Sequence, residues 1–432
     1  MTVQEKAAAM KLDSPKMAAV SAEVRNGALF RIKDTLLSHQ KEIFDANARD
    51  LEEAAKNNVP ESVVKRLKFS EQKLSDVIKG IENLAALPDK VHEIQLVRQL
   101  DEGLTLVKES CPIGVIGVIF EARPDALVQI ASLCIKSGNC AILKGGSETK
   151  YTNKVLFDLI YDAAMQSGLP KNCLFQVEQR EEIATLLACH GSVDLIIPRG
   201  SNAFVQYIMD NTKIPVMGHA DGICHIYVDK TFDIQKAIPV IIDAKTQYTA
   251  ACNAVETLLI HKDALERLMP KLNEALKTHH IELRATREIA DQYDSIPATE
   301  EDFSTEYLDL ILSAKTVENI EEAVNHINRY GSHHTDCIIT EDEDAAKYFM
   351  KMVDSAGVYQ NCSTRFADGF RYGFGAEVGI STGKIHARGP VGIEGLLTYK
   401  YKLFGNGHIV EDYASGQKEF HFKDLTNVRG TD

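Results

Sequence analysis

An uninterrupted apolar run at residues 113–120, Ile-Gly-Val-Ile-Gly-Val-Ile-Phe, restricts the fold more than any other segment of the chain. The run is short and rich in isoleucine and valine, which is typical of a strand buried on both of its faces. Strands of that kind occur in parallel sheets whose two faces are covered by helices. The sequence therefore predicts an α/β domain that contains this strand.

Helices and strands alternate in short steps after this run. The first series continues with a helix at 126–137 closed by Gly138-Asn139, a strand at 140–143, a helix at about 149–167, a strand at 174–177, a helix near 181–189 and a strand at 194–197. A second series has strands at 224–228, 257–261, 308–313 and 337–340, and the boundary between the series lies near 215–223. The alternation predicts two α/β domains, each with a parallel sheet and right-handed crossovers.

The flanking segments have different patterns. Residues from about 15 to 95 show helical spacing of apolar residues, and Ser70 is the expected N-cap of one helix. Residues 95–109 alternate in polarity around a turn at 101–103, which predicts a protruding two-stranded arm. Near Tyr399 the chain becomes strand-like again and then polar, as expected of a tail that packs elsewhere.

Composition excludes several classes of protein. The 432 residues are 44% hydrophobic and 25% charged, which is globular material rather than a disordered or fibrous chain. Nine cysteines without a C-x-x-C pair predict neither a zinc site nor a disulfide framework, and they suit a reducing compartment. The N-terminus lacks the apolar core of a signal peptide and no run spans a bilayer, so we expect a cytosolic protein. A net charge of -14 argues against nucleic-acid binding.

Cys252 is the candidate nucleophile. It lies among small and polar residues just ahead of an apolar strand, whereas the other cysteines mostly lie among aliphatic residues. A lone intracellular cysteine is more often structural. The start of a short helical turn would stabilise a thiolate, and the backbone N–H groups of Cys252 and Asn253 would be available to an oxyanion.

Three further motifs follow predicted strands. Residues 144–148 (Lys-Gly-Gly-Ser-Glu) fall at the carboxyl edge of the first sheet, where α/β proteins bind ligands, although an ordinary turn has the same composition. Residues 198–202 open a helix whose N-terminus suits an anion. Arg123 requires an anionic partner, for which Glu121 and Asp125 are the ordinary candidates. The adjacent His333 and His334 make poor joint ligands, so no metal site is expected.

Six stretches together resemble the γ-glutamyl phosphate reductase family of the aldehyde dehydrogenase superfamily: 111–126, 142–148, 243–261, 326–336, 358–381 and 387–399. The resemblance implies an aldehyde dehydrogenase-like α/β fold with two parallel-sheet domains and a β-strand oligomerisation flap. It implies an NADP-binding domain over 1–222 with an oligomerisation arm at about 95–110, a catalytic domain over 223–392 that contains Cys252, and a flap and C-terminal tail over 393–432.

The resemblance also implies roles for single residues. Cys252 takes the nucleophile's place, with the Asn253 N–H and Arg123 at the oxyanion. The implied cofactor-binding residues are Lys144 at the adenosine ribose, Ser147 where NAD-preferring relatives often carry a glutamate, Gly200 and Ser201 near the pyrophosphate and nicotinamide, and Glu306 at the nicotinamide ribose. The small hydroxyl of Ser147 leaves room for a 2′-phosphate, which favours NADPH. Arg365 and Ser363 are the expected ligands of the substrate's α-carboxylate and α-amino groups.

Two departures from the wider superfamily indicate the substrate. Hydrolytic relatives carry a general-base glutamate upstream of the cysteine, but the corresponding residues 217–222 contain none. Arg123 stands where those relatives have an oxyanion-hole asparagine, and a cation there suits an acyl phosphate. A thioester that must survive until hydride arrives benefits from the missing base.

The resemblance therefore implies NADPH-dependent reduction of L-glutamyl 5-phosphate to L-glutamate 5-semialdehyde, the second step of proline biosynthesis from glutamate. It further implies a homo-oligomer, and a separate glutamate 5-kinase that supplies the substrate through a transient complex. Two alternatives stay open: another aldehyde dehydrogenase acting on a different aldehyde or acyl phosphate, and a catalytically silent scaffold that keeps the fold.

Overall fold

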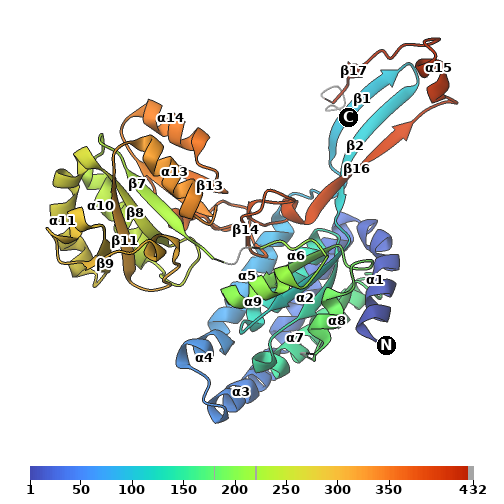
Figure 1. Cartoon of the computed structure of the whole chain (residues 1–432). Helices are drawn as coiled ribbons and strands as arrows, with labels where there is room; N and C mark the ends of the chain where they lie inside the picture. Colours follow the sequence, from blue (N-terminus) through green and yellow to red (C-terminus); the bar gives the residue numbers. More distant parts are fainter. Residues whose placement is uncertain (180, 219–220, 427–432) are drawn as a thin grey trace.

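The computed structural model describes residues 1–179, 181–218 and 221–426. Figure 1 shows two α/β lobes joined side by side and an arm of strands that projects from the first lobe. No helix in these described ranges is long and apolar enough to cross a membrane. The arrangement confirms the predicted fold class of two parallel-sheet units with an added β-strand flap.

Five helices precede the first sheet in the described chain: α1 (Val3–Ala18), α2 (Ala22–Ser38), α3 (Gln40–Lys56), α4 (Glu61–Leu67) and α5 (Glu71–Ala86). The helical region begins at Val3 rather than near residue 15, because Thr2 and Glu5 form a capping box at its start. Ser70 caps α5 as predicted, since its hydroxyl accepts from Lys73 N at 3.3 Å.

The first sheet is parallel and has the order β5-β4-β3-β6. Its strands are β3 (Val115–Phe120), β4 (Cys140–Lys144), β5 (Leu174–Gln176) and β6 (Leu195–Arg199). The accompanying helices are α6 (Pro124–Lys136), α7 (Lys150–Gln166), α8 (Glu182–Leu187) and α9 (Asn202–Asp210), with a 3₁₀ turn, η1 (Ser147–Thr149), before α7. Every residue of β3 is buried, which confirms the inference from the apolar run.

The second sheet is also parallel, with the order β10-β9-β11-β8-β7-β12-β13. Its strands are β7 (Cys224–Val228), β8 (Val255–His261), β9 (Glu282–Ala285), β10 (Ile296–Pro297), β11 (Ile311–Val317), β12 (Thr335–Ile339) and β13 (Gly357–Gln360). Its helices are α10 (Ile234–Thr246), α11 (Leu265–Thr278), α12 (Arg287–Ala290), α13 (Ile320–Tyr330) and α14 (Glu343–Met352), and its 3₁₀ turns are η2 (Lys262–Ala264), η3 (Glu301–Ser304) and η4 (Thr364–Phe366).

The strand predicted at 308–313 was misplaced, because β11 begins only at Ile311. Leu308 is apolar but adopts a left-handed backbone with φ of 56°, which does not belong to a strand.

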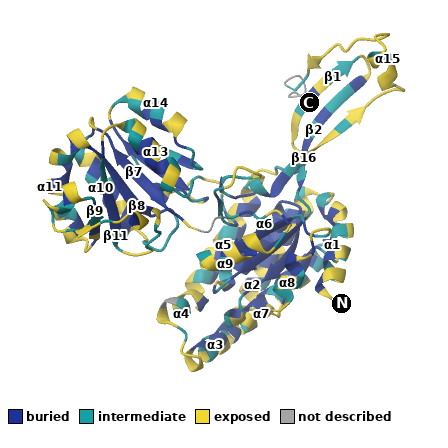
Figure 2. Cartoon of the chain, in the orientation of Figure 1, coloured by how far each residue is buried: buried dark blue, intermediate teal, exposed yellow. Residues whose placement is uncertain are grey.

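The arm is a separate antiparallel sheet with the order β16-β2-β1-β17. It joins β1 (Ile94–Asp101) and β2 (Leu104–Pro112) to β16 (Leu397–Phe404) and β17 (Lys423–Asp424), and α15 (Val410–Ala414) lies between the last two strands. The predicted hairpin turn is present, with Gly103 at φ of 71°. Four apolar side chains on β16 are 50–58% exposed, as the yellow strand in Figure 2 illustrates: Tyr399, Tyr401, Leu403 and Phe404.

Part of the segment before the predicted boundary at residue 392 packs against the first lobe. Ala376, Val378 and Val391 precede that boundary but belong to the apolar core of the first lobe. The short strands β14 (Ile380–Ser381) and β15 (Gly389–Pro390) and the turn η5 (Glu394–Leu396) lie in or next to this returning segment. The chain therefore re-enters the first lobe before it reaches β16.

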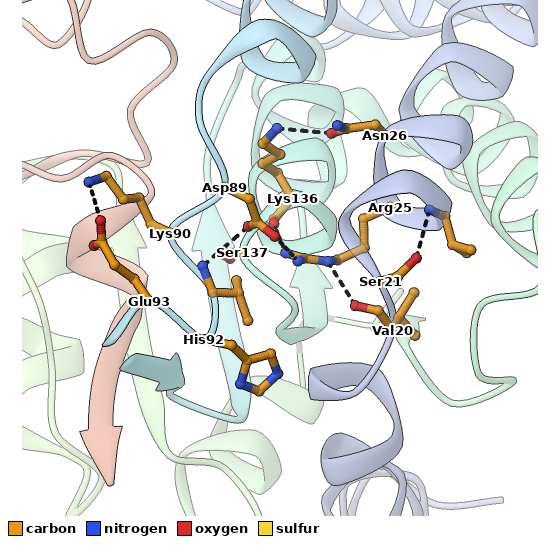
Figure 3. A network of polar contacts seen from close by, with 12 residues as sticks. Val20, Ser21, Arg25, Asn26, Asp89, Lys90, His92, Glu93, Lys136 and Ser137 are labelled. Carbon is orange, nitrogen blue, oxygen red and sulfur yellow. Dashed lines mark hydrogen bonds and ion pairs between the residues drawn. The ribbon is translucent and has the colours of Figure 1, made fainter. Parts of the chain in front are cut away.

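A buried polar network ties the N-terminal helices to the C-terminal end of α6 (Figure 3). Lys136 is 2% exposed, and its Nζ donates to Ala85 O at 3.0 Å and to Leu87 O at 2.9 Å. Arg25 is equally buried and donates to the carbonyl oxygen of Lys136 and to Asp89. Each cation thereby caps carbonyl groups at a helix C-terminus, where the helix dipole favours positive charge. Burial lowers the pKa of Lys136.

Replacing Lys136 with Met should remove this capping while keeping most of the side-chain volume. Two buried helix-end carbonyls and Asn26 then lose their donor, so we expect the free energy of unfolding to fall by about 2–4 kcal/mol. Urea denaturation followed by circular dichroism measures the change. Lys16→Met is the control, because that side chain is 72% exposed and should stay within about 0.5 kcal/mol. Equal losses in both variants would contradict the capping role.

Candidate active site

Cys252 lies in the turn that connects α10 to β8, and its side chain is partly exposed. The turn is closed by Ala254 N, which donates to Ala251 O at 2.8 Å, and by Ala251 N, which donates to Tyr248 O. The expectation of a helix start at Cys252 was therefore wrong, because the next element is the strand β8. The thiol therefore does not lie at a helix N-terminus.

A buried ion pair closes the base of this turn. Lys245 at the end of α10 and Glu256 at the start of β8 are fully buried, and Nζ lies 2.6 Å from the carboxylate oxygen Oε2. Burial raises the pKa of Glu256 and lowers that of Lys245, because both charges have left water. A glutamate inside the otherwise apolar strand Val-Glu-Thr-Leu-Leu-Ile was the sequence signal for this pair.

The segment around η4 holds the turn from the other side. Asn253 is 3% exposed and donates from Nδ2 to Ala367 O at 2.8 Å, while Thr364 Oγ1 donates to Asn253 O at 2.7 Å. Gly222 packs against the same turn so closely that a Cβ on it would lie 2.1 Å from Cys252 O. The main chain of the candidate nucleophile is thus fixed on two sides.

His334 was missed as a site residue by the sequence reasoning. Its Nε2 lies 3.2 Å from Cys252 Sγ, although the two residues are 82 positions apart, and His334 is fully buried. The neighbouring His333 turns away, with Nδ1 at 2.6 Å from Asp354 O. Within the described ranges, no group of three or more His, Cys, Asp or Glu could hold a metal ion. Only tertiary structure reveals this contact, since no sequence spacing connects the two residues.

Two arginines lie within electrostatic range of Cys252. Arg199, the last residue of β6, is half-buried, and burial together with the nearby Arg123 lowers its pKa. Arg365 is 8% exposed, and its Nε donates to Gln247 Oε1 at 2.9 Å. Burial and Arg371 lower the pKa of Arg365, whereas Cys252 opposes this shift. The structure therefore brings the predicted substrate residue Arg365 beside the cysteine turn.

Ser363 is 4% exposed and accepts from Arg365 N at 3.3 Å, so its hydroxyl caps η4. Its predicted contact with substrate stays a prediction.

Arg123 lines a cavity of about 590 Å³ that also reaches Tyr248 and Ala250 beside the cysteine turn. The remaining lining residues are mostly charged: Glu61, Lys65, Arg66, Lys73 and Asp125. Neither expected partner holds Arg123, because Asp125 pairs with Lys73 at 3.3 Å and Glu121 accepts from Ser201 N at 3.1 Å. In the described part of the chain, Arg123 forms no ion pair, so its guanidinium is available to an anion in the cavity.

The predicted cofactor residues gather at the carboxyl edge of the first sheet. Lys144 ends β4 and is 3% exposed, with Nζ at 2.5 Å from Gly145 O, and Ser147 is exposed on η1. Gly200 and Ser201 immediately precede α9. Glu306 reaches this helix start from the second lobe, because its Oε2 accepts from Asn202 Nδ2 at 2.6 Å. His219 and Ala220, from the stretch that lacks a glutamate, lie outside the described residues.

Three comparisons with known proteins identify the same family of relatives. A model of the aldehyde dehydrogenase family matches residues 1–290. The γ-glutamyl phosphate reductase of Ruminiclostridium cellulolyticum is 54% identical over 94% of this chain and 94% of its own, and that of Acetivibrio thermocellus is 54% identical over 97% of each. The crystal structure of the γ-glutamyl phosphate reductase from Thermotoga maritima covers 94% of this chain and 99% of its own, with 38% identity and a TM-score of 0.91.

Adding one methyl group at Gly222 should disturb the cysteine turn. The Cβ of Gly222→Ala would meet the Cys252 carbonyl at 2.1 Å and the Cys252 Cα at 2.5 Å, so the turn must shift. We expect the free energy of unfolding, measured by urea denaturation, to fall by about 1–3 kcal/mol. Gly191→Ala is the matched control, because nothing lies within 4 Å of its Cβ. A Gly222→Ala protein as stable as the control would contradict this close approach.

Proposed function

Because the chain belongs to the γ-glutamyl phosphate reductase family of the aldehyde dehydrogenases, we propose that it reduces L-glutamyl 5-phosphate to L-glutamate 5-semialdehyde with release of phosphate. The proposed route passes through a thioester on Cys252, with NADPH as the hydride donor. The observation that carries the proposal is the position of Cys252. Cys252 is partly exposed in a fixed turn, within electrostatic range of Arg199 and Arg365.

In the proposed first half of the reaction, Cys252 Sγ attacks the acyl carbon and the carbon–oxygen bond to phosphate breaks. The Asn253 N–H and Arg123 stabilise the negative charge that develops on the acyl oxygen. Arg123 also suits the leaving phosphate, because it shares its cavity with Lys65, Arg66 and Lys73. The surplus of cations over the carboxylates of Glu61 and Asp125 favours a doubly charged group there.

Two features support reduction rather than hydrolysis of the thioester. The stretch 217–222 contains no glutamate that would activate water. Gly222, at the end of that stretch, lies against the Cys252 main chain, where a side chain would collide with the carbonyl. The one carboxylate of this stretch, that of Asp221, accepts from the Asn202 side chain at the start of α9.

The residues at the edge of the first sheet fit a dinucleotide. Members of the aldehyde dehydrogenase family use NAD or NADP, and we assign Lys144 and Ser147 to the adenosine ribose. Gly200 and Ser201 offer the N-terminus of α9 to the pyrophosphate, and Glu306 is assigned to the nicotinamide ribose. NADPH, when bound, would supply the hydride that reduces the acyl group. Ser147 is exposed and uncharged, which suits the 2′-phosphate of NADP.

The other end of the substrate is assigned to Arg365, with Ser363 beside it. Arg365 lies next to the cysteine turn through its bond to Gln247, and a guanidinium is well suited to an α-carboxylate. Ser363 lies against Arg365 in the same 3₁₀ turn.

We place the reaction in the cytoplasm as the second step of proline biosynthesis, where a glutamate 5-kinase supplies the acyl phosphate through a transient complex. We also propose that the chain forms a homo-oligomer through its arm. The exposed apolar side chains of β16 on an antiparallel edge strand support this assignment, because such an edge pairs readily with a second copy.

Replacing Cys252 with Ala should abolish the reaction. The reverse direction is convenient to measure: glutamate semialdehyde, phosphate and NADP should give NADPH, read at 340 nm. We expect wild type to be active only with phosphate, and Cys252→Ala to lose about a thousandfold or more of the rate. Cys111→Ala is the control, because that cysteine is also partly exposed but lies on β2.

Equal rates in wild type and Cys252→Ala would exclude the covalent route. Oxidation to glutamate without phosphate would instead favour another aldehyde dehydrogenase activity, and inactivity of both proteins would favour a silent scaffold.

Replacing Ser147 with Glu should change the cofactor preference. A carboxylate at this exposed position repels the 2′-phosphate by about 1–2 kcal/mol, so we expect the KM for NADP to rise roughly tenfold while that for NAD changes little. Initial rates of the reverse reaction with each cofactor measure both values. Ser147→Gln has the same length without the charge and should keep the NADP preference. Equal effects of Glu and Gln would show that charge is not the cause.

A further inference from the structure

The proposed function uses the Cys252 thiol but assigns no group to its proton. A thiol becomes a good nucleophile only when it loses that proton. His334 Nε2 lies 3.2 Å from Cys252 Sγ, within reach of a sulfur hydrogen bond, and the imidazole is fully buried. We propose that His334 is the general base that deprotonates Cys252, a role that rests on the function proposed above.

A second contact orients the imidazole for this task. His334 Nδ1 lies 2.9 Å from the hydroxyl oxygen of Thr335, which is 1% exposed. When Nδ1 carries the proton and donates to that hydroxyl, Nε2 presents its lone pair to the thiol. Gly357 faces Thr335 across the β12–β13 ladder, and a Cβ there would lie 3.1 Å from the hydroxyl. Glycine at this position therefore leaves room for the orienting group.

The backbone of His334 is held as firmly as that of Cys252. Gly357 N donates to His334 O at 2.9 Å, so the residue is attached to the edge of the second sheet. Asp336, two positions later, accepts from His225 N at 2.7 Å and from the Ser355 hydroxyl at 2.5 Å. Both partners of the thiol–imidazole contact thus lie on fixed segments, which favours a preformed pair.

The proton that the thiol loses stays within this pair during the proposed cycle. As the sulfur–carbon bond forms and phosphate leaves, the thiol proton moves to His334 Nε2. After the acyl group has been reduced, the carbon–sulfur bond breaks, the aldehyde is released and the sulfur departs as a thiolate. The proton on Nε2 then returns to Sγ and restores the pair, while the departing phosphate takes from solvent the one proton that the overall reduction consumes.

Other ionisable groups also face the thiol. Arg199 at the end of β6 and Arg365 in η4 act on Cys252 electrostatically, and Cys224 of β7 donates from Sγ to Cys252 O at 3.4 Å. Asp336 on β12 is the nearby acid, and its oxygens are engaged as described. The two cations would stabilise a thiolate without any base. The test must therefore separate a proton acceptor from a static field.

Alkylation of Cys252 by iodoacetamide in the free enzyme distinguishes a proton acceptor from the static field of the two arginines. The reaction needs neither substrate nor cofactor. The rate at Cys252 is read by mass spectrometry between pH 6 and 10. In His334→Gln we expect the rate at pH 7 to fall about tenfold or more and to recover above about pH 9, where an unassisted thiol ionises. His333→Asn is the matched control, since Asn tolerates the positive φ of 60° there, and it should follow wild type.

Two further variants keep the test decisive if His334→Gln folds poorly. Thr335→Val keeps the shape but removes the orienting hydroxyl, and should slow alkylation at pH 7 about threefold. In His334→Ala, added imidazole should restore part of the alkylation rate and of the phosphate-dependent reverse reaction.

A pH profile of His334→Gln identical to that of wild type, or absence of rescue by imidazole, would overturn the role of His334. His334-dependent alkylation in an enzyme without the reverse reaction would instead contradict the proposed substrate and leave the thiol–imidazole pair standing.

Discussion

The buried ion pair between Lys245 and Glu256 is the constraint on which the candidate site depends. It joins the last turn of α10 to the first residues of β8 and so fixes both ends of the segment that carries Cys252. A buried pair of this kind is a weak source of net stability, because desolvation offsets most of the attraction. The pair has a larger effect on geometry, because each buried charge is stable only next to the other and the two side chains must therefore stay together. The position of the thiol therefore follows from an electrostatic requirement at the base of its turn.

Much of the fold was predictable because its central strands are buried on both faces. The apolar runs of β3, β4, β7 and β12 have no other plausible environment, and their boundaries agree with the structure to within a few residues. The strand predictions fail where the polarity of a segment does not indicate its backbone conformation. Leu308 is apolar, which is typical of a strand, but its backbone is left-handed. The short strand β9 contains charged residues, so its sequence does not indicate a buried strand. The return of residues 376–391 to the first core depends on tertiary packing, which has no local signal.

The site was predictable only in part, for a related reason. Resemblance identified Cys252, Lys144, Ser147 and Glu306 as separate residues, and the structure adds which of them meet. Glu306 reaches the start of α9 from the opposite lobe, and His334 reaches Cys252 from the strand β12. Such contacts join segments far apart in sequence, so neither periodicity nor motif spacing reports them. Conversely, the expected partners of Arg123 were ordinary neighbours in sequence, and the fold gives both carboxylates other donors.

The proposed function requires a protein with a net charge of -14 to bind anionic groups beside Cys252. Net charge does not decide the local field, because cations outnumber carboxylates in the cavity at Arg123 and the carboxylates near it already have donors. Glu148 accepts from Ala122 N at 2.6 Å, and Glu121 accepts from Ser201 N at the start of α9. That last N–H belongs to the helix end assigned to the cofactor's pyrophosphate. A pyrophosphate that displaces Glu121 keeps the Ser201 N–H paired with an anion, and the Glu121 carboxylate then has to gain water or another donor in its place.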